Sequence, residues 1–589
     1  PRWNQFMCFS RSVVIFFTVM FLIVGGKVGA QDRQVDLLLN EHWNWYLERN
    51  PVFAGQLGNR TGDGKLPCVS VANQIDSSSH LKKFLEAAKA IDPNDLSRNA
   101  ALNLQIFIRF LEDDISEYLH EAYLIPITNR WGFHIYFAEL YKRLPFDNQQ
   151  DYESYVNRLE AFSKYTDEHI ELLSLGIEKG RVLPAIVLQG YEDTITTHIF
   201  EQPTKSPLYT PFTHMPDNID SVVRQTLAVR GAKAIGDIVI PAYRKFLAFM
   251  QDRYMPAATN TIGISAIPGG REFYRHRVKK YTTMDVTPEQ VHEIGLKEVE
   301  RIRNEMELIP RELKFEGDFG EFLQFLRTDP QFYATDAESY KREVAYILKK
   351  MDGELPKLFG KLPRTPYGIK EIPAYIAPKT TAAYYQPPSG NGKNAGFYFI
   401  NTYNLKSRPL YQLEALSLHE AVPGHHLQLA LQQELEGLPE FRKYNGFTAF
   451  IEGWALYSER LGLETGFYQD PYSNFGRLSY EMWRACRLVV DTGIHYLGWT
   501  REQAIGFMAE NTALSRHNIV AEVDRYISWP GQALAYKMGE LKIRELRALA
   551  SRQLVNEFNI REFHDVILGS GAVPMDVLEA NVLRYLEQR

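Results

Sequence analysis

Cysteine is scarce in this chain, which limits what can hold the fold together. The 589 residues include three cysteines, Cys8, Cys68 and Cys486. Cys8 falls in an N-terminal segment that we expect to be removed, so one disulfide at most, between Cys68 and Cys486, could form in the mature chain. Two thiols in so long a chain specify neither a disulfide framework nor a cysteine metal site.

Long apolar runs are almost absent. The exception, residues 13–24, follows Arg11 and precedes a stretch of small residues ending at Ala30. This order is typical of a secretory signal peptide, so we expect residues 1–30 to be an upstream extension and a signal. No later segment reaches the roughly 18 uninterrupted apolar residues of a spanning helix. The mature chain is therefore expected to have no stable membrane span and to be exported, to the periplasm or the medium.

A strong charge of either sign is also lacking. The net charge is −6 for 589 residues, with 23% charged and 45% hydrophobic residues. This balance predicts a large globular body and gives no reason to expect nucleic acid or an anionic membrane as a partner. No Gly-rich phosphate loop, nucleophile elbow or repeat period is present. The sequence specifies no oligomeric state.

Apolar residues at three- and four-residue spacing predict a mainly α fold. We expect an N-terminal helical scaffold over residues 31–260, with helices at 36–48, 78–91, 97–119, 151–179 and 221–250. A catalytic helical half, residues 261–589, would face it across a central cleft. In that half Thr287 and Thr500 open capping boxes, and strands are predicted at 371–377 and 395–404. The edge of this sheet (371–404) would either bind an extended peptide or pack as an ordinary hairpin.

The densest cluster of reactive residues is His419-Glu-Ala-Val-Pro-Gly-His425-His426. Histidines at i and i+4 of a helix bind zinc in many peptidases, with the Glu at i+1 as general base, but here i+4 is Pro423. Pro423 and Gly424 predict a bulge that returns His425 to the i+4 role. We therefore favour His419 and His425 as ligands. His426 stays as the competing ligand or a substrate donor, and the histidines could instead cap a kinked core helix.

A third ligand is predicted at Glu452, which lies among the apolar residues Phe450, Ile451 and Trp454. A buried carboxylate needs a cation or a metal as its partner. The metal site would then lie within residues 413–464, with one Zn²⁺ ion held by His419, His425 and Glu452 and its fourth position left to water. Glu420 would be the general base.

Side chains for substrate binding are predicted further along the chain. Arg484, Arg487 and His495 share a helical face with Asp491. Arginines can hold a substrate carboxylate, and a tyrosine hydroxyl, from Tyr526 or Tyr536, can donate to an oxyanion. Tyr403, near the end of the second predicted strand, is a further candidate. All of these could instead belong to buried ion pairs and aromatic core.

Four stretches carry a resemblance to a known family. Residues 419–428, 287–302, 450–459 and 525–539 together resemble the bacterial family called domain of unknown function 885. That family looks like a relative of the helical gluzincin peptidases, such as thimet oligopeptidase and the zinc carboxypeptidases. Compared with their His-Glu-x-Gly-His pattern, two residues are inserted before Gly424, and the analogy supports His425 as the second ligand.

These observations predict an exported zinc metallopeptidase that acts on peptides or oligopeptides. Glu420 would assist the attack of a zinc-bound water, and Tyr536 or Tyr526 would stabilise the oxyanion. Two alternatives stay open: a zinc hydrolase acting on a non-peptide amide or ester, and a metal-free binding or scaffold protein on the same fold.

Overall fold

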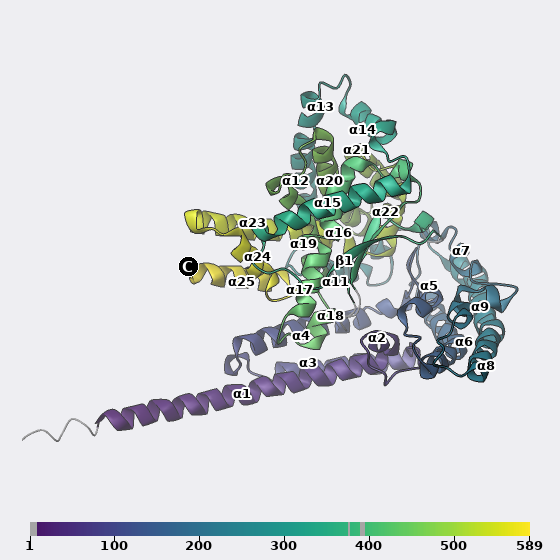
Figure 1. Ribbon diagram of the computed structural model, residues 1–589, viewed down its shortest axis with the longest axis horizontal. Helices are drawn as coiled ribbons and strands as arrows, with labels where there is room; N and C mark the ends of the chain where they lie inside the picture. The colour runs from purple at the N-terminus through teal and green to yellow at the C-terminus, as the bar shows by residue number, and fades with distance from the viewer. Residues whose placement is uncertain (1–8, 375–376, 389–394) are drawn as a thin grey trace, which may run out of the picture.

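The computed structural model describes residues 9–374, 377–388 and 395–589, excluding the side chains of residues 9–28 and 379. Helices make up most of these residues, and one three-stranded sheet lies near the middle of the molecule (Figure 1). The prediction of a mainly α fold with one small sheet is confirmed.

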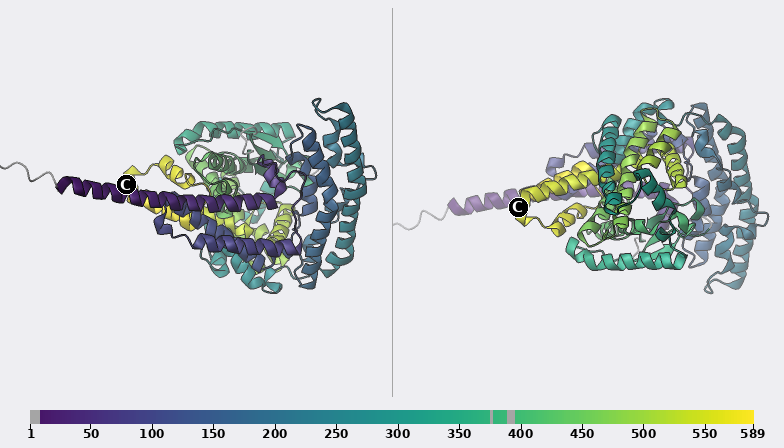
Figure 2. Two further views of the ribbon diagram at one scale, coloured as in Figure 1. Left: turned by 90° about the horizontal axis from the view of Figure 1, so that it is seen from below. Right: turned by 90° about the horizontal axis from the view of Figure 1, so that it is seen from above.

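The helices of the first half include one long N-terminal helix and a group of three that stand side by side at one end of the molecule (Figures 1 and 2). The long helices are α1 (Phe9–Arg49), α3 (Val71–Lys89), α4 (Arg98–Leu119), α6 (Gln149–Glu178), α8 (Ser221–Ala234) and α9 (Ile240–Phe249). The shorter ones are α2 (Pro51–Gln56), α5 (Phe133–Ala138), α7 (Asp193–Thr196) and α10 (Met255–Ala257). Helices α6, α8 and α9 form the end group, and α1 packs on α3 and α4.

The second half supplies the remaining helices and the sheet. Its helices are α11 (Gly270–Thr282), α12 (Pro288–Met306), α13 (Leu308–Glu312), α14 (Phe319–Thr328), α15 (Ala337–Leu358), α16 (Leu413–Glu420), α17 (His425–Glu434), α18 (Glu440–Tyr444), α19 (Thr448–Leu461), α20 (Pro471–His495), α21 (Arg501–Asn511), α22 (Arg516–Ser528), α23 (Ala535–Leu554), α24 (Ile560–Leu568) and α25 (Met575–Glu587). Two pairs, α12 with α20 and α19 with α23, pack along their lengths and frame the centre.

Helix starts with local capping signals are where the sequence predicts them. Thr287 and Gln290 form a reciprocal capping box at the start of α12, and Thr500 and Gln503 do the same for α21. Ser97 caps α4 through the amide of Ala100. Each cap satisfies amides that the first helical turn leaves without a partner, so short sequence patterns suffice to place these ends.

The sheet differs from its prediction in one strand and adds another. Its order is β1-β3-β2, with β1 (Tyr367–Glu371) parallel and β2 (Ala383–Gln386) antiparallel to β3 (Gly396–Ile400). The predicted strand 395–404 corresponds to β3. The predicted strand 371–377 is wrong, because β1 ends where it was to begin and Pro373 cannot donate to a ladder. The segment Ser389-Gly390-Asn391-Gly392, whose composition predicts a loop before this strand, lies outside the described residues.

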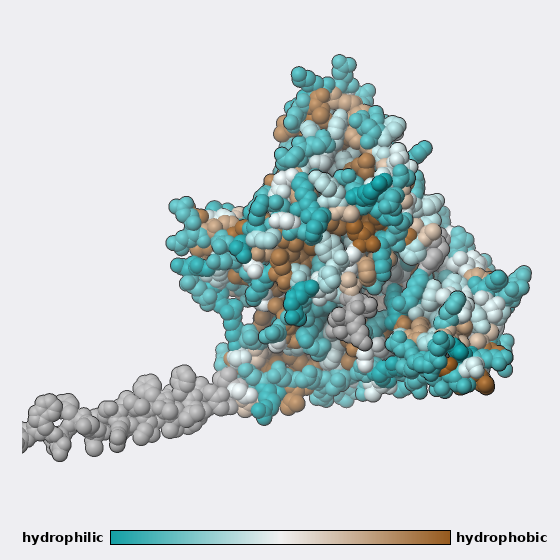
Figure 3. Space-filling view, in the orientation of Figure 1, coloured by the Kyte–Doolittle hydropathy of each residue, from teal (hydrophilic) through white to brown (hydrophobic). Residues whose placement is uncertain are grey.

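Two large hydrophobic cores run through the molecule, and both combine the two halves of the chain. One joins Phe162 and Phe246 to Met482 and Val523, and the other joins Phe107 to Trp454. Residue 260 therefore does not separate two cores. Some hydrophobic residues remain on the surface, and they gather near the middle of the face shown in Figure 3.

The predictions for the chain's N-terminus and cysteines have separate outcomes. The predicted signal, within residues 1–30, lies almost wholly outside the residues whose side chains are described. Within the described part of the chain, no helix is long and apolar enough to cross a membrane. Cys68 is exposed, Cys486 is buried in α20, and both are free thiols, so they form no disulfide.

Candidate metal centre

The two histidine ligands predicted from the sequence lie on either side of a break between two helices. Helix α16 ends at Glu420 and α17 begins at His425. Across the break the amide of Gly424 donates to Leu418 O at 2.9 Å, and that of His426 donates to Ala421 O at 3.0 Å. The prediction of one bulged helix is therefore wrong, because one helix ends at Glu420 and a second begins at His425.

Gly424 is required at this break by lack of space. A Cβ at position 424 would lie 1.9 Å from the carbonyl oxygen of His419. On the other side, the indole of Trp454 donates to Pro423 O at 2.8 Å. The four-residue link is therefore held against both α16 and α19, and its tight path brings the rings of His419 and His425 to a centroid separation of 4.8 Å.

His419, His425 and Glu452 are brought together into one cluster. Their candidate ligand atoms all lie within 4.8 Å of one another. Glu452 Oε2 lies 3.7 Å from His419 Nε2 and 3.4 Å from His425 Nε2. Tetrahedral zinc with bonds of roughly 2.0–2.1 Å separates its ligand atoms by about 3.4 Å. The spacing therefore fits a zinc ion between these three atoms.

The state of Glu452 supports the same fit. Its Oε2 atom is buried and has no hydrogen-bond partner among the described residues. A buried carboxylate oxygen without a donor is costly unless a cation lies beside it. Burial raises the pKa of Glu452, but the charges of His425 and His419 outweigh it and hold that pKa well below its usual range. The donor set of two imidazoles and one carboxylate is one that suits zinc.

The close contact between α19 and α23 positions Glu452. A Cβ on its neighbour Gly453 would lie 2.6 Å from the Cα of Gly539, and a Cβ on Gly539 would lie 1.9 Å from Ala449 O. Glycine at both positions lets the two helices approach almost to backbone contact. Glu452 is thus carried by a helix whose distance from its neighbour is fixed.

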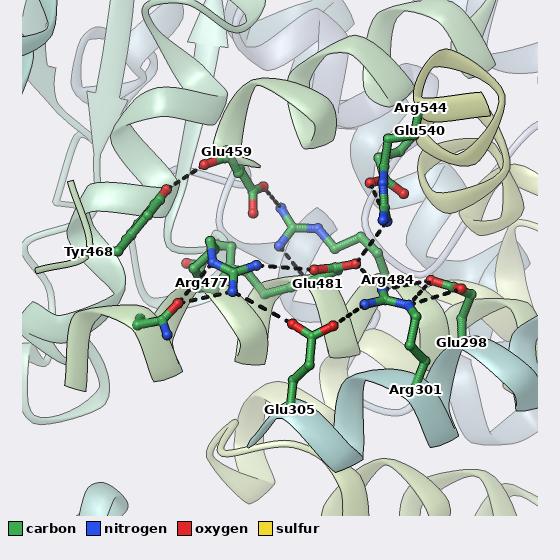
Figure 4. A network of polar contacts seen from close by, with 12 residues as sticks. Glu298, Arg301, Glu305, Glu459, Tyr468, Arg477, Glu481, Arg484, Glu540 and Arg544 are labelled. Atoms are coloured by element: carbon green, nitrogen blue, oxygen red, sulfur yellow. Dashed lines mark hydrogen bonds and ion pairs between the residues drawn. The ribbon is translucent and has the colours of Figure 1, made fainter. Parts of the chain in front are cut away.

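A second carboxylate lies behind the first histidine. Glu459 Oε1 accepts from His419 Nδ1 at 2.8 Å. It also pairs with Arg484 Nη2 at 3.1 Å, the contact drawn in Figure 4. Since a carboxylate only accepts, the proton sits on Nδ1 and Nε2 is left to face Glu452. Burial by itself lowers the pKa of His419. The contacts with Glu452 and Glu459 raise it by more, and the resulting pKa is about 9. The two carboxylates around this ring therefore favour a positive charge at Nε2, either a second ring proton or a metal cation in its place.

Glu459 was not predicted, although a signal for it exists. It follows Glu452 by seven residues, or two helical turns, and so lies on the same face of α19. A histidine that ligates a metal usually donates its other nitrogen to a carboxylate, so a second Glu on the face of α19 that carries Glu452 is the signal that points to Glu459.

A buried ion-pair network fixes the helix that carries Arg484 (Figure 4). Glu481, one turn before it on α20, pairs with Arg477 at 3.3 Å, Lys537 at 2.9 Å and Arg544 at 3.5 Å, and also with Arg301. These partners come from α12, α20 and α23. The network joins the helices around the candidate site into one frame.

Glu420, the predicted base, sits at the end of α16 beside the cluster. It is half-buried. Burial raises its pKa, against the lowering effect of the charges of His419 and His425, and the net direction is upward. A carboxylate with a raised pKa accepts a proton more readily than a free one, as a general base needs to do.

His426 does not join the cluster. Its Nδ1 lies 2.8 Å from the hydroxyl of Tyr385 and its Nε2 lies 3.1 Å from Thr365 O. Burial lowers its pKa to about 4. Both ring nitrogens are thus used to hold β2 and the segment before β1 against α17, which leaves neither for a metal or a substrate.

The two predicted tyrosines have different surroundings. Tyr526 is buried, and its hydroxyl has Trp483, Arg487 and Glu522 as partners at 3.1, 3.1 and 2.9 Å. It serves as part of a polar core. Tyr536 is half-buried and lies one helical turn before Gly539, the residue of α23 that meets Gly453 beside Glu452. Burial and the charge of Glu452 raise its pKa. Of the two tyrosines, Tyr536 is the one that is both beside the cluster and partly open to solvent.

The other predicted substrate residues are mostly occupied. Asp491 accepts from the Tyr274 hydroxyl at 2.6 Å and from the Gly531 amide at 3.0 Å, so it orients neither arginine. His495 accepts from the Ile264 amide at 3.0 Å and donates to Tyr526 O at 2.9 Å. Tyr403 is 52% exposed, outside the buried cluster. Arg484 pairs with Glu459 and donates to Tyr480 O, and Arg484 and Arg487 each have one buried nitrogen without a partner among the described residues, Nε and Nη1 respectively.

Comparisons with known proteins place the chain among proteins of unknown function. The family profile described as "Bacterial protein of unknown function (DUF885)" matches residues 51–582. A crystal structure of a candidate lipoprotein from Colwellia psychrerythraea is similar at 28% identity, with a TM-score of 0.88, over 95% of this chain and 100% of that one. A candidate lipoprotein of unknown function from Shewanella oneidensis shares the fold at 18% identity, with a TM-score of 0.69, over 93% and 99%. Among curated protein sequences no match was found.

Proposed function

We propose that this chain, which belongs to the bacterial family DUF885, is a zinc-dependent metallopeptidase. The observation that carries the proposal is the spacing of His419, His425 and Glu452, whose Oε2 lies 3.7 and 3.4 Å from the two Nε2 atoms. Glu420, next to the first ligand, and Tyr536, near the third, add the acid-base and oxyanion groups that peptide hydrolysis requires.

The residues around the cluster have distinct tasks in this reaction. A zinc ion held there would lower the pKa of a water molecule and polarise the scissile carbonyl. Glu420 accepts a proton from the attacking water and delivers it to the leaving amine. The Tyr536 hydroxyl donates a hydrogen bond to the oxygen of the tetrahedral intermediate. Glu459 fixes the tautomer and orientation of His419.

The edge of the sheet supports a peptide as substrate. Strand β2 is an edge strand and packs beside α16, whose last residues are His419 and Glu420. Across from it, Glu139 and Arg143 lie close enough that their charges act on the pKa of Tyr384 in β2. An extended peptide paired with β2 would therefore run between the sheet and the N-terminal segment that carries Glu139 and Arg143, and would pass the metal site.

Two measurements test the proposal together. The purified protein should hold about one equivalent of zinc, and a panel of quenched peptides should be cleaved in a zinc-dependent manner. Glu420→Gln should retain the zinc and lower turnover by about a hundredfold or more. An unaffected Glu420→Gln variant would rule out this mechanism. Cleavage confined to acyl-amide or ester substrates would indicate a different zinc hydrolase, and a metal content below about a tenth of an equivalent would indicate a binding protein.

The proposed location is outside the cytoplasm. The two similar crystal structures are described as candidate lipoproteins, which favours an exported or surface-anchored protein. The predicted signal within residues 1–30 favours the same placement, in the periplasm or the medium.

A further inference from the structure

A second group of buried charges lies one turn along α20 from Arg484. Arg487 is 4% exposed, and its guanidinium stacks on the rings of Trp483 and Tyr536 at 4.4 and 4.1 Å. Its Nε donates to the Tyr526 hydroxyl at 3.1 Å and its Nη2 pairs with Glu522 at 3.2 Å. Its Nη1 is buried and has no partner among the described residues. A guanidinium group with a free buried N–H donor is costly to keep unless a ligand accepts from it.

The charges in this group do not balance. Glu522 is shared by three guanidinium groups, those of Arg130 at 3.4 Å, Arg487 at 3.2 Å and Arg525 at 2.9 Å. A neighbouring carboxylate, Asp524, pairs with Arg501 instead. Arg525 also acts on the Asp491 carboxylate, and with Asp491 counted as ionised three guanidinium groups face two carboxylates, an excess of one positive charge in a group whose outermost member, Arg130, is 22% exposed. Because an uncompensated buried charge is strongly unfavourable, this excess favours the binding of an anion.

The group lies next to the candidate metal centre. Tyr536, on which Arg487 stacks, lies one helical turn before Gly539, the residue of α23 that meets Gly453 beside Glu452, and the charge of Glu452 acts on its hydroxyl. Arg484 and Arg487 are three residues apart on α20, a rise of about 4.5 Å, and Arg484 contacts the carboxylate behind His419. Tyr536 is half-buried, so it forms the side of the group that solvent reaches. A ligand that enters past Tyr536 would therefore reach Arg487 from the side of the candidate metal centre.

We propose that Arg487, backed by Arg525, binds a carboxylate group of the peptide substrate beside the metal centre. Arginine suits this role because its planar N–H donors match a carboxylate. The carboxylate belongs either to the free C-terminus or to an acidic side chain near the cleaved bond. This assignment rests on the proposed peptidase function and adds the substrate class.

The test compares peptides that differ in one charge. For the zinc-loaded wild type, a free-acid peptide should have a KM about 10- to 100-fold lower than its C-terminally amidated form, as expected for one charged hydrogen bond. A third peptide, amidated but with Glu beside the cleaved bond, identifies the source of the carboxylate: a restored low KM assigns the site to the side chain. Equal KM values for all three peptides would overturn the proposal, without any variant having to fold.

Variants then assign the effect to Arg487. Arg487→Met should remove the preference by raising the KM for the acidic peptide and leaving the amidated one nearly unchanged, and Arg487→Lys should keep part of it. Arg501→Met is the matched control, because it removes a guanidinium group that pairs with a carboxylate of α22 outside the group. The proposal is wrong if Arg487→Met, like the control variant, changes the KM values of the acidic and the amidated peptide by the same factor.

The two proposals can fail separately. If the wild type cleaves no peptide, the peptidase function fails, and the carboxylate subsite is then tested by calorimetric binding of the acid and amide peptides to the same protein. Binding that distinguishes the two peptides and is lost in Arg487→Met would retain the subsite. Cleavage without any preference for a carboxylate would reject the subsite alone.

Discussion

The contact between α19 and α23 offers a sharp test of the candidate centre, through the variant Gly453→Ala. A Cβ at position 453 would lie 2.6 Å from both the Cα and the carbonyl carbon of Gly539 and 2.9 Å from the amide nitrogen of Glu540. Non-bonded carbon atoms normally pack at roughly 3.5–4.0 Å. Because the obstructing atoms are backbone, no side chain can rotate away, so we expect the two helices to separate locally by about 1 Å.

The cost to stability follows from two opposing terms. Overpacking a core typically costs about 1–3 kcal/mol, while Ala in a helix interior is favoured over Gly by about 0.5–1 kcal/mol. Gly506→Ala, in α21, isolates the second term, because a Cβ there meets nothing within 4 Å. Urea unfolding of the metal-free variants should therefore place Gly453→Ala about 1–3 kcal/mol below Gly506→Ala in free energy of unfolding. Equal stabilities would show that α19 and α23 are not in backbone contact.

The same variant tests the role of Glu452. This residue precedes Gly453, and zinc sites accept ligand displacements of only about 0.2 Å. A shift of about 1 Å should weaken zinc binding by at least the 10- to 100-fold that is typical of a disturbed supporting shell. Competition with a chromogenic chelator measures this. Wild-type affinity in a variant that has lost the expected stability would show that Glu452 is not a ligand.

Two further predictions concern histidines. His425→Ala should abolish tight zinc binding. His426→Ala should retain the metal and lose about 1–3 kcal/mol of stability, because Tyr385 and Thr365 lose a hydrogen-bond partner. If metal analysis gives the opposite result, His426 and not His425 is the ligand. Burial lowers the pKa of His134, His169 and His564 to about 3 in the folded protein. The unfolded chain binds these protons near pH 6.5, so stability is fully present above that pH. Each of these three histidines should lower the free energy of unfolding by up to about 1.4 kcal/mol per pH unit as the pH falls from 6.5 towards 3. Urea midpoints that stay constant from pH 7 to 5 would contradict this.

What could be predicted from the sequence depended on how locally each feature is determined. The capping boxes at Thr287 and Thr500 were predictable because four consecutive residues form them. Strand β2 was missed because its four residues, Ala383–Gln386, show little alternation and gain their order from pairing with β3. Local pattern is a weak guide where a neighbouring strand supplies the stabilising contacts.

The candidate site shows the same division. Pro423 and Gly424 indicated that the helix must deviate, which was enough to prefer His425, but the sequence did not distinguish a bulge from a break. The assignments of Tyr526 and His495 depended on which face of a helix points to the metal, and that is decided by packing between α20 and α22. Both side chains are instead tied into buried polar contacts.

The geometry of α19 explains why the six-residue spacing of the histidines can still form a site. Glu452 and Glu459 are two turns apart on one face, a rise of about 10.5 Å. The two glutamate side chains reach towards each other from these positions and the His419 ring lies between their carboxylates, with Nε2 facing Glu452 at 3.7 Å and Nδ1 bonded to Glu459 at 2.8 Å. The imidazole therefore lies along α19, which fixes its orientation without help from its own helix. Once one histidine is held in this way, the second has only to reach the same carboxylate. The break after Glu420 lets His425 do so at 3.4 Å, where an unbroken helix would turn it away.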